Sequence, residues 1–305
     1  MHVNREENDL SPQFSIQPNP KVQFTIVYED DFLIALNKPA GVVTLPGKKH
    51  LYDSLLNGAF VHWGKKLQNL GKKRDFGLLH RLDRGTSGIV LIALQAETYD
   101  ALRKLFETRQ IKKSYWAVIA GVIHPNQGKC TVPIAEIKKE GRKKALLVPK
   151  LKNQKGQHPQ QKTYSRTQSK SVKRTYQTQT KTIKAQDAST TYRVLESQKS
   201  PYGLSSLVHC EPKTGRLHQI RIHMTALGSY VLGDFDYAGK TQLNQFMKST
   251  ARKQLALHAG KVELIHPITN INLTIKAPLS EKLQAILQDL NLQLPSELRI
   301  NTRSY

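Results

Sequence analysis

The chain has 305 residues, two cysteines, a formal net charge of +24 and an isoelectric point near 10.0. Such an excess of Lys and Arg exceeds what solubility requires and favours a polyanionic partner, with nucleic acid ahead of a membrane surface, because neutralising phosphates releases bound counterions. The longest apolar run is too short to span a bilayer, the amino terminus has no secretion-signal pattern and the cysteines form no Cys-x-x-Cys pair, so we expect a soluble cytoplasmic monomer without a disulfide framework, a thiolate metal site or membrane contact.

The length suits one large folded domain with additions. Residues 1–21 are polar and carry three prolines, which predicts a flexible lead. We expect the folded domain over residues 22–295, interrupted by a basic insertion at 150–184, and a short tail over 296–305.

The first predicted elements are two apolar runs, residues 24–28 and 32–36, separated by Glu-Asp-Asp. This pattern is typical of a β-hairpin. The sequence Asn-Lys-Pro-Ala-Gly-Val-Val follows at 37–43, where proline and glycine favour a tight loop. Taken alone, this Lys-Pro-x-Gly pattern indicates no more than a turn.

The central stretch is His-Arg-Leu-Asp-Arg-Gly-Thr-Ser-Gly at residues 80–88. Apolar residues 76–79 predict a short strand before it, and residues 89–94 predict a buried strand after it, so the turn should lie at the rim of a sheet. Asp83 stands between Arg81 and Arg84, whose charges favour the ionised carboxylate and suit a nucleophile. The alternative is an aspartate that only closes an Asx-type turn.

Residues 96–110 place apolar side chains at helical spacing and predict an amphipathic helix. The aromatic and β-branched content of residues 113–121 predicts a strand that contains Tyr115, which could be an ordinary strand tyrosine. Four further short strands are predicted over residues 130–136, 143–148, 190–196 and 206–210.

The segment 150–184 contains ten Lys or Arg residues and no Asp or Glu. It has too few apolar residues to offset the entropy of ordering, so we expect a long disordered loop. This loop could grip RNA, or it could be a solvated insertion without a specific role. Its ten cations account for less than half of the net charge, so the basic character is general.

The next polar cluster is Thr-Gly-Arg-Leu-His-Gln-Ile-Arg-Ile-His at residues 214–223. Apolar spacing and Gly228 predict a short helix that begins near His218 and ends at a glycine cap. Arg221 would lie in its first turn, away from the apolar stripe, and could be a plain surface arginine. Residues 262–275 predict a hairpin, and a final helix should begin after Ser280.

Several of these segments together resemble one family. Residues 80–88 resemble the His-Arg-Leu-Asp-x-x-Thr-Ser-Gly signature of the RluA-type pseudouridine synthases, which isomerise uridine within RNA. Residues 37–41 resemble Asn-Lys-Pro-x-Gly, residues 113–117 resemble Lys-x-Tyr-x-Ala, and residues 215–223 resemble Gly-Arg-x-His-Gln-x-Arg-x-His. A Leu-Gly-Asp-x-x-Tyr-Gly element is also similar at 232–239, with Ala238 as an extra residue; we expect it to support the fold.

The resemblance covers roughly residues 24–280 and implies an α+β protein with the pseudouridine synthase fold. In that fold a mainly antiparallel mixed β-sheet with flanking helices carries a central active-site cleft. Residues 22–295 would then be the catalytic domain. Many members also have an amino-terminal RNA-binding module of the S4 type, which we do not expect before the first strand here.

The resemblance further implies an isomerase that converts specific uridines of structured ribosomal or transfer RNA to pseudouridine. Asp83 would be the catalytic residue, by attack on C1′ or by removal of a sugar proton. The substrate-binding residues would be Tyr115, which stacks on the base, Arg221, which pairs with the aspartate, and Arg81, which fills the space that the extruded uridine leaves. Neither a cofactor nor a metal is expected.

Two other functions remain as alternatives. The histidines could belong to a metal-dependent hydrolase, but His218 and His223 are five residues apart, about 140° around a helix, and no His-Glu-x-x-His occurs. A non-catalytic RNA-binding or ribosome-associated protein would fit the composition. The joint presence of Asp83, Tyr115 and Arg221 in their motifs favours the enzyme.

Overall fold

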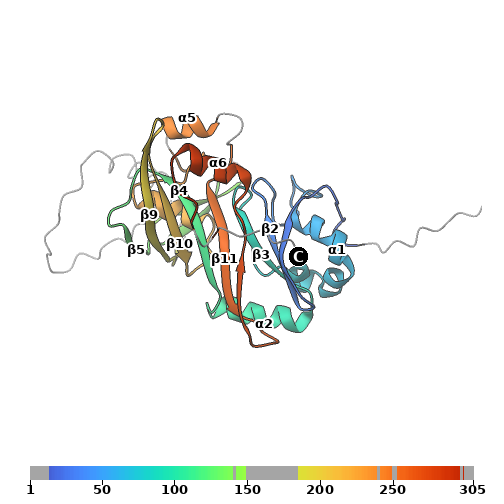
Figure 1. Cartoon of the computed structure of the whole chain (residues 1–305). Helices are drawn as coiled ribbons and strands as arrows, with labels where there is room; N and C mark the ends of the chain where they lie inside the picture. The colour runs from blue at the N-terminus through green and yellow to red at the C-terminus, as the bar shows by residue number, and fades with distance from the viewer. Residues whose placement is uncertain are drawn as a thin grey trace, which may run out of the picture.

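A computed structural model describes residues 14–139, 142–148, 185–238, 241–248, 253–295 and 298. These residues form a large sheet, a small sheet and flanking helices (Figure 1). In chain order the elements are β1 (Thr25–Glu29), β2 (Leu33–Lys38), α1 (Leu55–Leu70), the 3-10 helix η1 (Lys72–Gly77), β3 (Ser87–Ala93), α2 (Ala96–Glu107), β4 (Lys112–Ala120), β5 (Gln127–Cys130), β6 (Ile134–Lys139), β7 (Arg142–Leu147), β8 (Ala185–Gln186), β9 (Thr190–Ser200), β10 (Gly203–Pro212), α4 (Gln219–Ala226), α5 (Gln242–Lys248), β11 (Leu257–Ile265), β12 (Asn272–Lys276) and α6 (Glu281–Asp289).

The large sheet has nine strands in the order β1-β2-β3-β11-β4-β10-β9-β5, with β12 paired to β11. Every pairing is antiparallel except that of β3 with β11. The predicted mainly antiparallel mixed sheet is therefore confirmed. Strand β4 lies at its centre, between β11 and β10, and carries Tyr115 into the middle of the molecule.

Helices α1 and α2 cover opposite faces of the β2–β3 part of the sheet, because successive strand residues point to opposite faces. Helix α1 packs on the even-numbered residues and α2 on the odd-numbered ones. The first set contains Ile34, Leu36, Val90 and Ile92, and the second contains Leu33, Ala35, Ile89 and Leu91.

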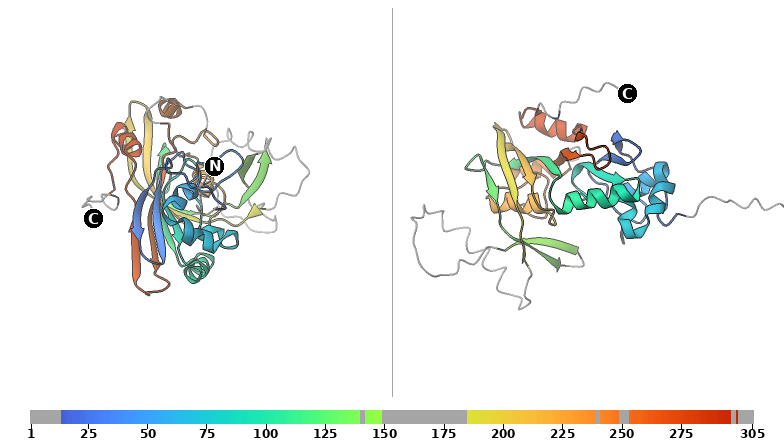
Figure 2. Two further views of the ribbon diagram at one scale, coloured as in Figure 1. Left: turned by 90° about the vertical axis from the view of Figure 1, so that its right-hand side faces the viewer. Right: turned by 90° about the horizontal axis from the view of Figure 1, so that it is seen from below.

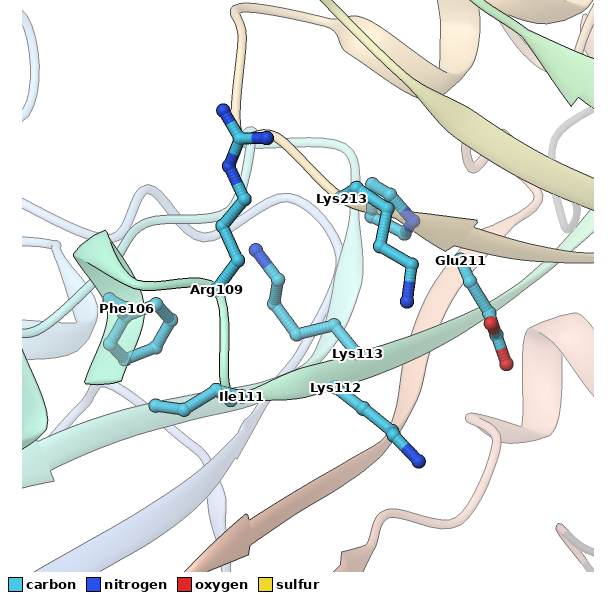
Figure 3. Close-up of a pocket in the computed structure, with 8 residues that line it drawn as sticks. Phe106, Arg109, Ile111, Lys112, Lys113, Glu211 and Lys213 are labelled. Atoms are coloured by element: carbon cyan, nitrogen blue, oxygen red, sulfur yellow. The ribbon is translucent and has the colours of Figure 1, made fainter.

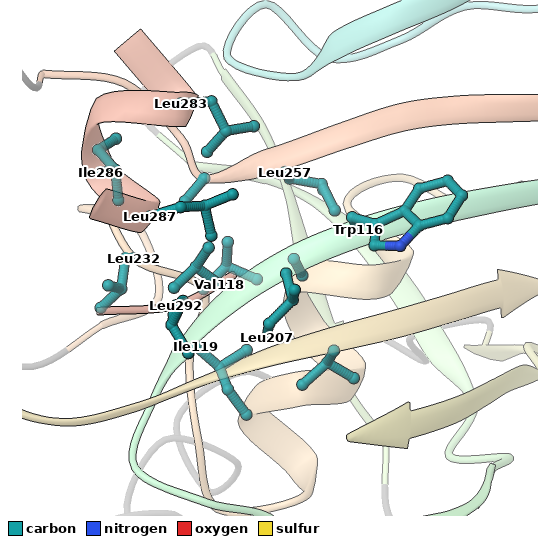
Figure 4. Close-up of a cluster of buried hydrophobic side chains, with 14 of the residues drawn as sticks. Trp116, Val118, Ile119, Leu207, Leu232, Leu257, Leu283, Ile286, Leu287 and Leu292 are labelled. Carbon is teal, nitrogen blue, oxygen red and sulfur yellow. The ribbon is translucent and has the colours of Figure 1, made fainter. Parts of the chain in front are cut away.

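The largest hydrophobic cluster joins β4, β10 and α6 (Figure 4). Helix α6 begins at the predicted cap, where the Ser280 side chain accepts a hydrogen bond from Leu283 N. Its apolar stripe then lies on the central strands, with Ile286 fully buried. This packing gives the strand that carries Tyr115 a rigid support.

A small sheet of β7, β6 and β8 stands out from the main body (Figure 2). Its apolar residues Ile134 and Ala145 pack with Ile222 of α4. Residues 149–184, which contain the predicted basic insertion, lie outside the described residues, as do 1–13 of the predicted lead and all of the predicted tail except residue 298.

The structure corrects two local expectations. Residues 76–79 do not form a strand: η1 ends at Gly77, Asp75 and Phe76 have positive φ angles, and only Leu78 bridges to the sheet, at Ile92. Within the expected flexible lead, residues 14–21 contact α1, since Phe14 packs edge-on against Phe60.

Helix α1 was not predicted from the residue pattern. It begins with a capping box in which the Ser54 side chain accepts from Asn57 N and the Asn57 side chain accepts from Ser54 N. An asparagine at this position takes the place of the usual Glu or Gln, so the local signal was easy to miss.

Candidate active site

Asp83 lies on the loop between η1 and β3, and contacts with a second loop hold this loop in place. Thr44 binds the backbone of Leu82 twice, because its hydroxyl donates to Leu82 O at 2.8 Å and accepts from Leu82 N at 3.1 Å. Gly41 N donates to Arg84 O at 2.7 Å. The 37–43 stretch, which looked like a plain turn, therefore belongs to the frame of the site.

Lys38 lies completely buried beneath both loops. Its ammonium donates to Pro39 O at 2.9 Å, to Val42 O at 2.7 Å and to Arg84 O at 3.4 Å. Burial lowers the pKa of Lys38 to about 7, while the nearby Asp83 charge acts in the opposite direction. The three carbonyl acceptors and Asp83 favour the ammonium form, since three donors are available only on the cation.

A hydrogen bond fixes one end of the 80–88 stretch, at His80, and close strand packing fixes the other, at Gly88. His80 is partly buried, and its Nε2 accepts from Leu91 N at 3.1 Å, which joins the loop to β3. Burial lowers the pKa of His80 to about 3, so the ring is neutral. At the other end Gly88 has φ +117°, and an added Cβ would lie 2.3 Å from Ala259 O of β11. Only glycine permits this close approach of the strands.

The basic side chains that face the Asp83 carboxylate come from α4 and its first cap residue. Arg221 Nη1 lies 3.6 Å and His218 Nε2 lies 3.8 Å from Asp83 Oδ2, and the aspartate side chain is 23% exposed. The two arginines beside it in sequence do not pair with it within the described part of the chain. Arg84 instead donates to Gly41 O at 2.9 Å, which corrects the expectation that Arg81 and Arg84 hold the charge on Asp83.

Arg221 is a buried arginine, not a surface one, with its side chain only 8% exposed. Its Nε and Nη2 donate to the two carboxylate oxygens of Asp234 at 2.7 and 2.8 Å, and Nη2 also donates to Asp236 at 2.8 Å. Burial opposes the charge, but the bonds to Asp234 and Asp236 raise the pKa of Arg221 overall. The guanidinium is thus a permanent cation, fixed by two carboxylates and presented to a third.

A hydrogen-bonded chain holds His218 beside the same carboxylate. His218 begins α4 in the left-handed backbone region, and its Nδ1 lies 2.6 Å from Tyr237 Oη. Tyr237 Oη also accepts from Ala145 N at 3.0 Å, so the hydroxyl is held on two sides; when it donates to His218 Nδ1, the proton of a neutral ring lies on Nε2, towards Asp83. Burial lowers the pKa of His218, although the charge of Asp83 opposes this shift.

Tyr115 projects from β4 into the same site. Burial, and then the negative charge of Asp83, raise the pKa of Tyr115 well above its usual value, so the phenol stays protonated. Its hydroxyl has no hydrogen-bond partner among the described residues. The ring is therefore a neutral apolar surface with one free polar group, which suits a stacked base.

Arg81 lies on the same loop, two residues before Asp83, with an exposed side chain and no ion pair to a described residue. The structure thus brings Asp83, Arg221 and Tyr115 together and leaves Arg81 at the rim. It also adds His218, Asp234, Asp236, Tyr237 and Lys38, to which no role in the chemistry was given.

One signal for these extra residues was present in the sequence. The element at 232–237 carries two aspartates and a tyrosine shortly after the helix that contains Arg221. Spacing alone did not reveal which of its side chains turn towards that helix. Helix α4 ends at Ala226, and the chain returns through Asp234, which is 1% exposed.

Two buried histidines serve the fold. His258 bridges Ser87 and Ala277, and His223 bridges Thr190 and Val132. Over the ranges that the structure describes, no group of three or more His, Cys, Asp or Glu side chains could hold a metal ion. No described helix is long and apolar enough to cross a bilayer.

Comparison with known proteins gives a consistent result. The profile of the family described as RNA pseudouridylate synthase matches residues 32–226. The ribosomal large subunit pseudouridine synthase D of Nitrosomonas europaea is 31% identical over 288 residues, which cover 94% of this chain and 69% of that protein. The synthase D of Zymomonas mobilis is 28% identical over 271 residues, with 88% and 73% covered.

Two solved structures share the architecture. Human RNA Pseudouridylate Synthase Domain Containing 4 superposes with a TM-score of 0.57 and 26% identity, covering 88% of this chain and 94% of that one. Human RNA Pseudouridylate Synthase Domain Containing 1 superposes with a TM-score of 0.56 over 91% and 98% of the two chains, and at 21% identity it bears on the fold alone.

Proposed function

This chain belongs to the RNA pseudouridylate synthase family and is an isomerase that acts on RNA, and from this premise we propose that Asp83 is its catalytic carboxylate and that its substrate is ribosomal RNA of the large subunit. The observation that carries the catalytic assignment is the meeting of Asp83 with Arg221 and His218 beside Tyr115.

Pseudouridine formation breaks the bond from C1′ to N1, turns the uracil and joins C1′ to C5, so one C5 proton is lost and N1 gains one. No electrons leave or enter the nucleotide. In the proposal the chain acts as a cytoplasmic monomer and needs neither a metal nor a cofactor. A positioned carboxylate, a surface for the detached base and fixed charges supply what the isomerisation requires.

Asp83 can act on the sugar through its second oxygen. The contacts with Arg221 and His218 both fall on Oδ2, whereas Oδ1 accepts no hydrogen bond from any described residue. In the proposal Oδ1 attacks C1′ as the bond to N1 breaks. Arg221 and His218 fix the orientation of the carboxylate, because their own positions are set by Asp234, Asp236 and Tyr237.

Tyr115 and Arg81 handle the nucleotide in this proposal. The neutral phenol ring of Tyr115 stacks on the uracil, and its hydroxyl can form a hydrogen bond with a base oxygen while the base turns. A uridine within folded RNA first leaves its stack, which costs a few kcal/mol. Arg81, exposed beside Asp83, fills the gap with a planar guanidinium that stacks where a lysine would not.

The substrate assignment rests on the relatives and on charge. Curated relatives from several bacteria are named ribosomal large subunit pseudouridine synthases, of type D in Nitrosomonas europaea and Zymomonas mobilis. The net charge of +24 matches a phosphate-rich partner. The non-catalytic RNA-binding alternative has no comparable support, because it leaves the clustered Asp83, Arg221 and His218 without a task.

The test is the Asp83→Asn variant on large-subunit ribosomal RNA transcripts labelled with tritium at uridine C5. We expect tritium release to fall by at least about a thousandfold, since an amide cannot attack C1′, while RNA affinity stays within about twofold. Asp31→Asn, at an exposed aspartate of the β1–β2 turn, is the matched control and should keep wild-type turnover. Substantial tritium release by Asp83→Asn contradicts the catalytic assignment.

A further inference from the structure

A small basic pocket lies next to the site, where the end of α2, the start of β4 and the end of β10 meet (Figure 3). Arg109, Lys112, Lys113 and Lys213 line it, with Glu211 as its one acidic lining residue. None of the four cations forms an ion pair with a described residue. The pocket therefore gathers positive charge that the described protein does not neutralise.

The pairing of the strands decides which of these side chains face one another. Lys113 precedes Tyr115 by two residues in β4, so the two side chains point to the same face of the sheet. Lys112 belongs to the opposite face. In Figure 3 the side chains of Arg109, Lys113 and Lys213 lie on one side of β4, and Lys112 and Glu211 point away from them. Cations therefore outnumber acids in the pocket, with Glu211 as the one acid against four cations.

Lys113 is held in this space at a cost in free energy. Burial lowers the pKa of Lys113, and its ammonium lies 5.7 Å from the centre of the Phe106 ring. The neighbouring His80 ring, which packs on Phe106, is neutral and offers no negative charge. A partly buried cation without an anion is unfavourable, and a site that keeps one is suited to an anionic ligand.

We infer that Arg109, Lys113 and Lys213 bind one backbone phosphate of the RNA, next to the uridine that meets Asp83. This inference rests on the proposed function and adds a subsite to it. A guanidinium and two ammonium groups match the oxygens of a phosphodiester, the anionic group that every nucleotide of the substrate carries.

The position of the pocket defines which phosphate it takes. Residues two apart in a strand are separated by about 7 Å, so the pocket begins one strand repeat from the ring that receives the base. That distance corresponds to a phosphate on the target nucleotide or on its immediate neighbour. A bound phosphate would set the register of the RNA strand, so that the extruded base falls on Tyr115 and its sugar on Asp83.

The test compares two double variants that remove the same charge. Arg109→Ala with Lys213→Ala removes two of the exposed cations that line the pocket, and Lys66→Ala with Lys104→Ala removes two exposed lysines of α1 and α2 that do not line it. Lys113→Met is a third variant, which keeps the apolar stem. The probe is a fluorescent oligouridylate of about ten residues, titrated at several salt concentrations between about 0.05 and 0.3 M.

We expect the pocket variant and Lys113→Met to raise the Kd about three- to tenfold at ~0.1 M salt and to reduce the slope of log Kd against log salt by about 0.7 to 1, the value for one lost phosphate contact. The control pair should keep the wild-type slope. An uncharged methylphosphonate oligouridylate should bind wild type and pocket variant equally. Equal slopes for the pocket and control variants on the phosphodiester probe would overturn the inference.

Two further arms separate this subsite from its alternatives. Inorganic phosphate should displace the probe no better than chloride at equal ionic strength. If phosphate displaces it better, and the pocket variant keeps the wild-type slope of log Kd against log salt, the pocket binds a free anion and has no role in RNA binding. Tritium release by the wild type is measured in parallel. If Asp83→Asn loses turnover while the pocket variant keeps the wild-type kcat/KM, the proposed function stands and the phosphate subsite is contradicted.

Discussion

At the scale of single residues, the surroundings of the Asp83 carboxylate depend on which basic side chains reach it. Its neighbours in sequence, Arg81 and Arg84, do not pair with it in the described structure, and Arg221 and His218 do so from more than a hundred residues away. Arg221 is already bound by Asp234 and Asp236, so its charge does not depend on Asp83. If Asp83 loses its charge by bonding to the sugar, as in the proposed reaction, the Arg221 guanidinium therefore stays in place.

The tautomer of His218 depends on Tyr237, which leads to a prediction. Tyr237→Phe removes the hydroxyl that donates to His218 Nδ1, so the ring no longer has a fixed reason to keep its proton on Nε2 towards Asp83. We expect kcat for tritium release to fall about three- to tenfold, the value of one neutral hydrogen bond, with RNA affinity unchanged. Steady-state kinetics with separate kcat and KM measure this.

Tyr28→Phe is the control for this variant, because it also removes one hydroxyl hydrogen bond, to Asp30, but far from the site. A kcat for Tyr237→Phe equal to that of Tyr28→Phe would show that the His218–Tyr237 pair is only structural. A pH profile adds a second readout. Loss of the Tyr237 bond should move the acidic limb of kcat, whereas a purely structural loss would scale the whole profile.

At the scale of elements, two loops make one unit. The loop before β3 carries Asp83, and the loop after β2 supplies Thr44, Gly41 and Lys38 to hold it. Lys38 ends β2 and pairs with Gly88 of β3, but Gly41, Thr44 and Asp83 lie outside the strands, so individual hydrogen bonds hold the two loops together there. The position of Asp83 thus depends on residues that look like ordinary turn formers.

Thr44→Val tests this coupling, since valine keeps the shape of threonine and loses the hydroxyl. Both the N–H and the carbonyl of Leu82 then lose a buried partner, and we expect the free energy of unfolding to fall by about 2 to 4 kcal/mol, with kcat falling as the loop loosens. Urea unfolding and tritium release measure the two effects.

Thr98→Val is the matched control. Thr98 is equally buried, in α2, but its hydroxyl has no hydrogen-bond partner among the residues that the structure describes, so the same change should leave stability equal or raise it. An unfolding free energy for Thr44→Val that matches that of Thr98→Val would show that the two loops are not coupled through Thr44.

At the scale of the whole molecule, neutral histidines are buried along the seams between elements. Burial lowers the pKa of His258 to about 4 and that of His80 to about 3, from 6.5 in the unfolded chain. Because the unfolded chain binds more protons below pH 6.5, the stability is full above pH 6.5 and falls as the pH drops from 6.5 towards 4. Each group contributes a slope of about 1.4 kcal/mol per pH unit in that window.

His258→Gln should flatten this dependence. Between pH 6.5 and pH 5 we expect the wild type to lose about 2 kcal/mol more unfolding free energy than the variant, because glutamine does not titrate. Urea unfolding at both pH values measures the difference. His62→Gln, at an exposed histidine, should keep the wild-type dependence. An identical pH dependence in His258→Gln and wild type would contradict the assignment of a buried neutral ring.

The sequence by itself determined most of the regular elements and the main candidate site residues. The strands β3 and β4 and the helices α2, α4 and α6 follow from apolar periods that act over a few residues, and the resemblance of three short motifs singled out Asp83, Tyr115 and Arg221. Local patterns sufficed because period and capping are properties of neighbouring residues. Helix α1 was not predicted, because its capping box uses Asn57 in place of Glu or Gln. A strand was wrongly predicted at 76–79, because an apolar run does not reveal the positive φ angles at Asp75 and Phe76.

Only the tertiary structure decided which charges meet. Asp234 faces Arg221 because the chain turns back after α4, and Lys113 faces Lys213 because β4 and β10 pair in one register. Contacts between residues so far apart in the chain depend on strand register and on how helices pack, which no local pattern encodes. The physical reason is that the whole fold decides which charges are buried next to each other. Burial removes the water that screens charges, so the partner of a buried charge strongly affects its free energy.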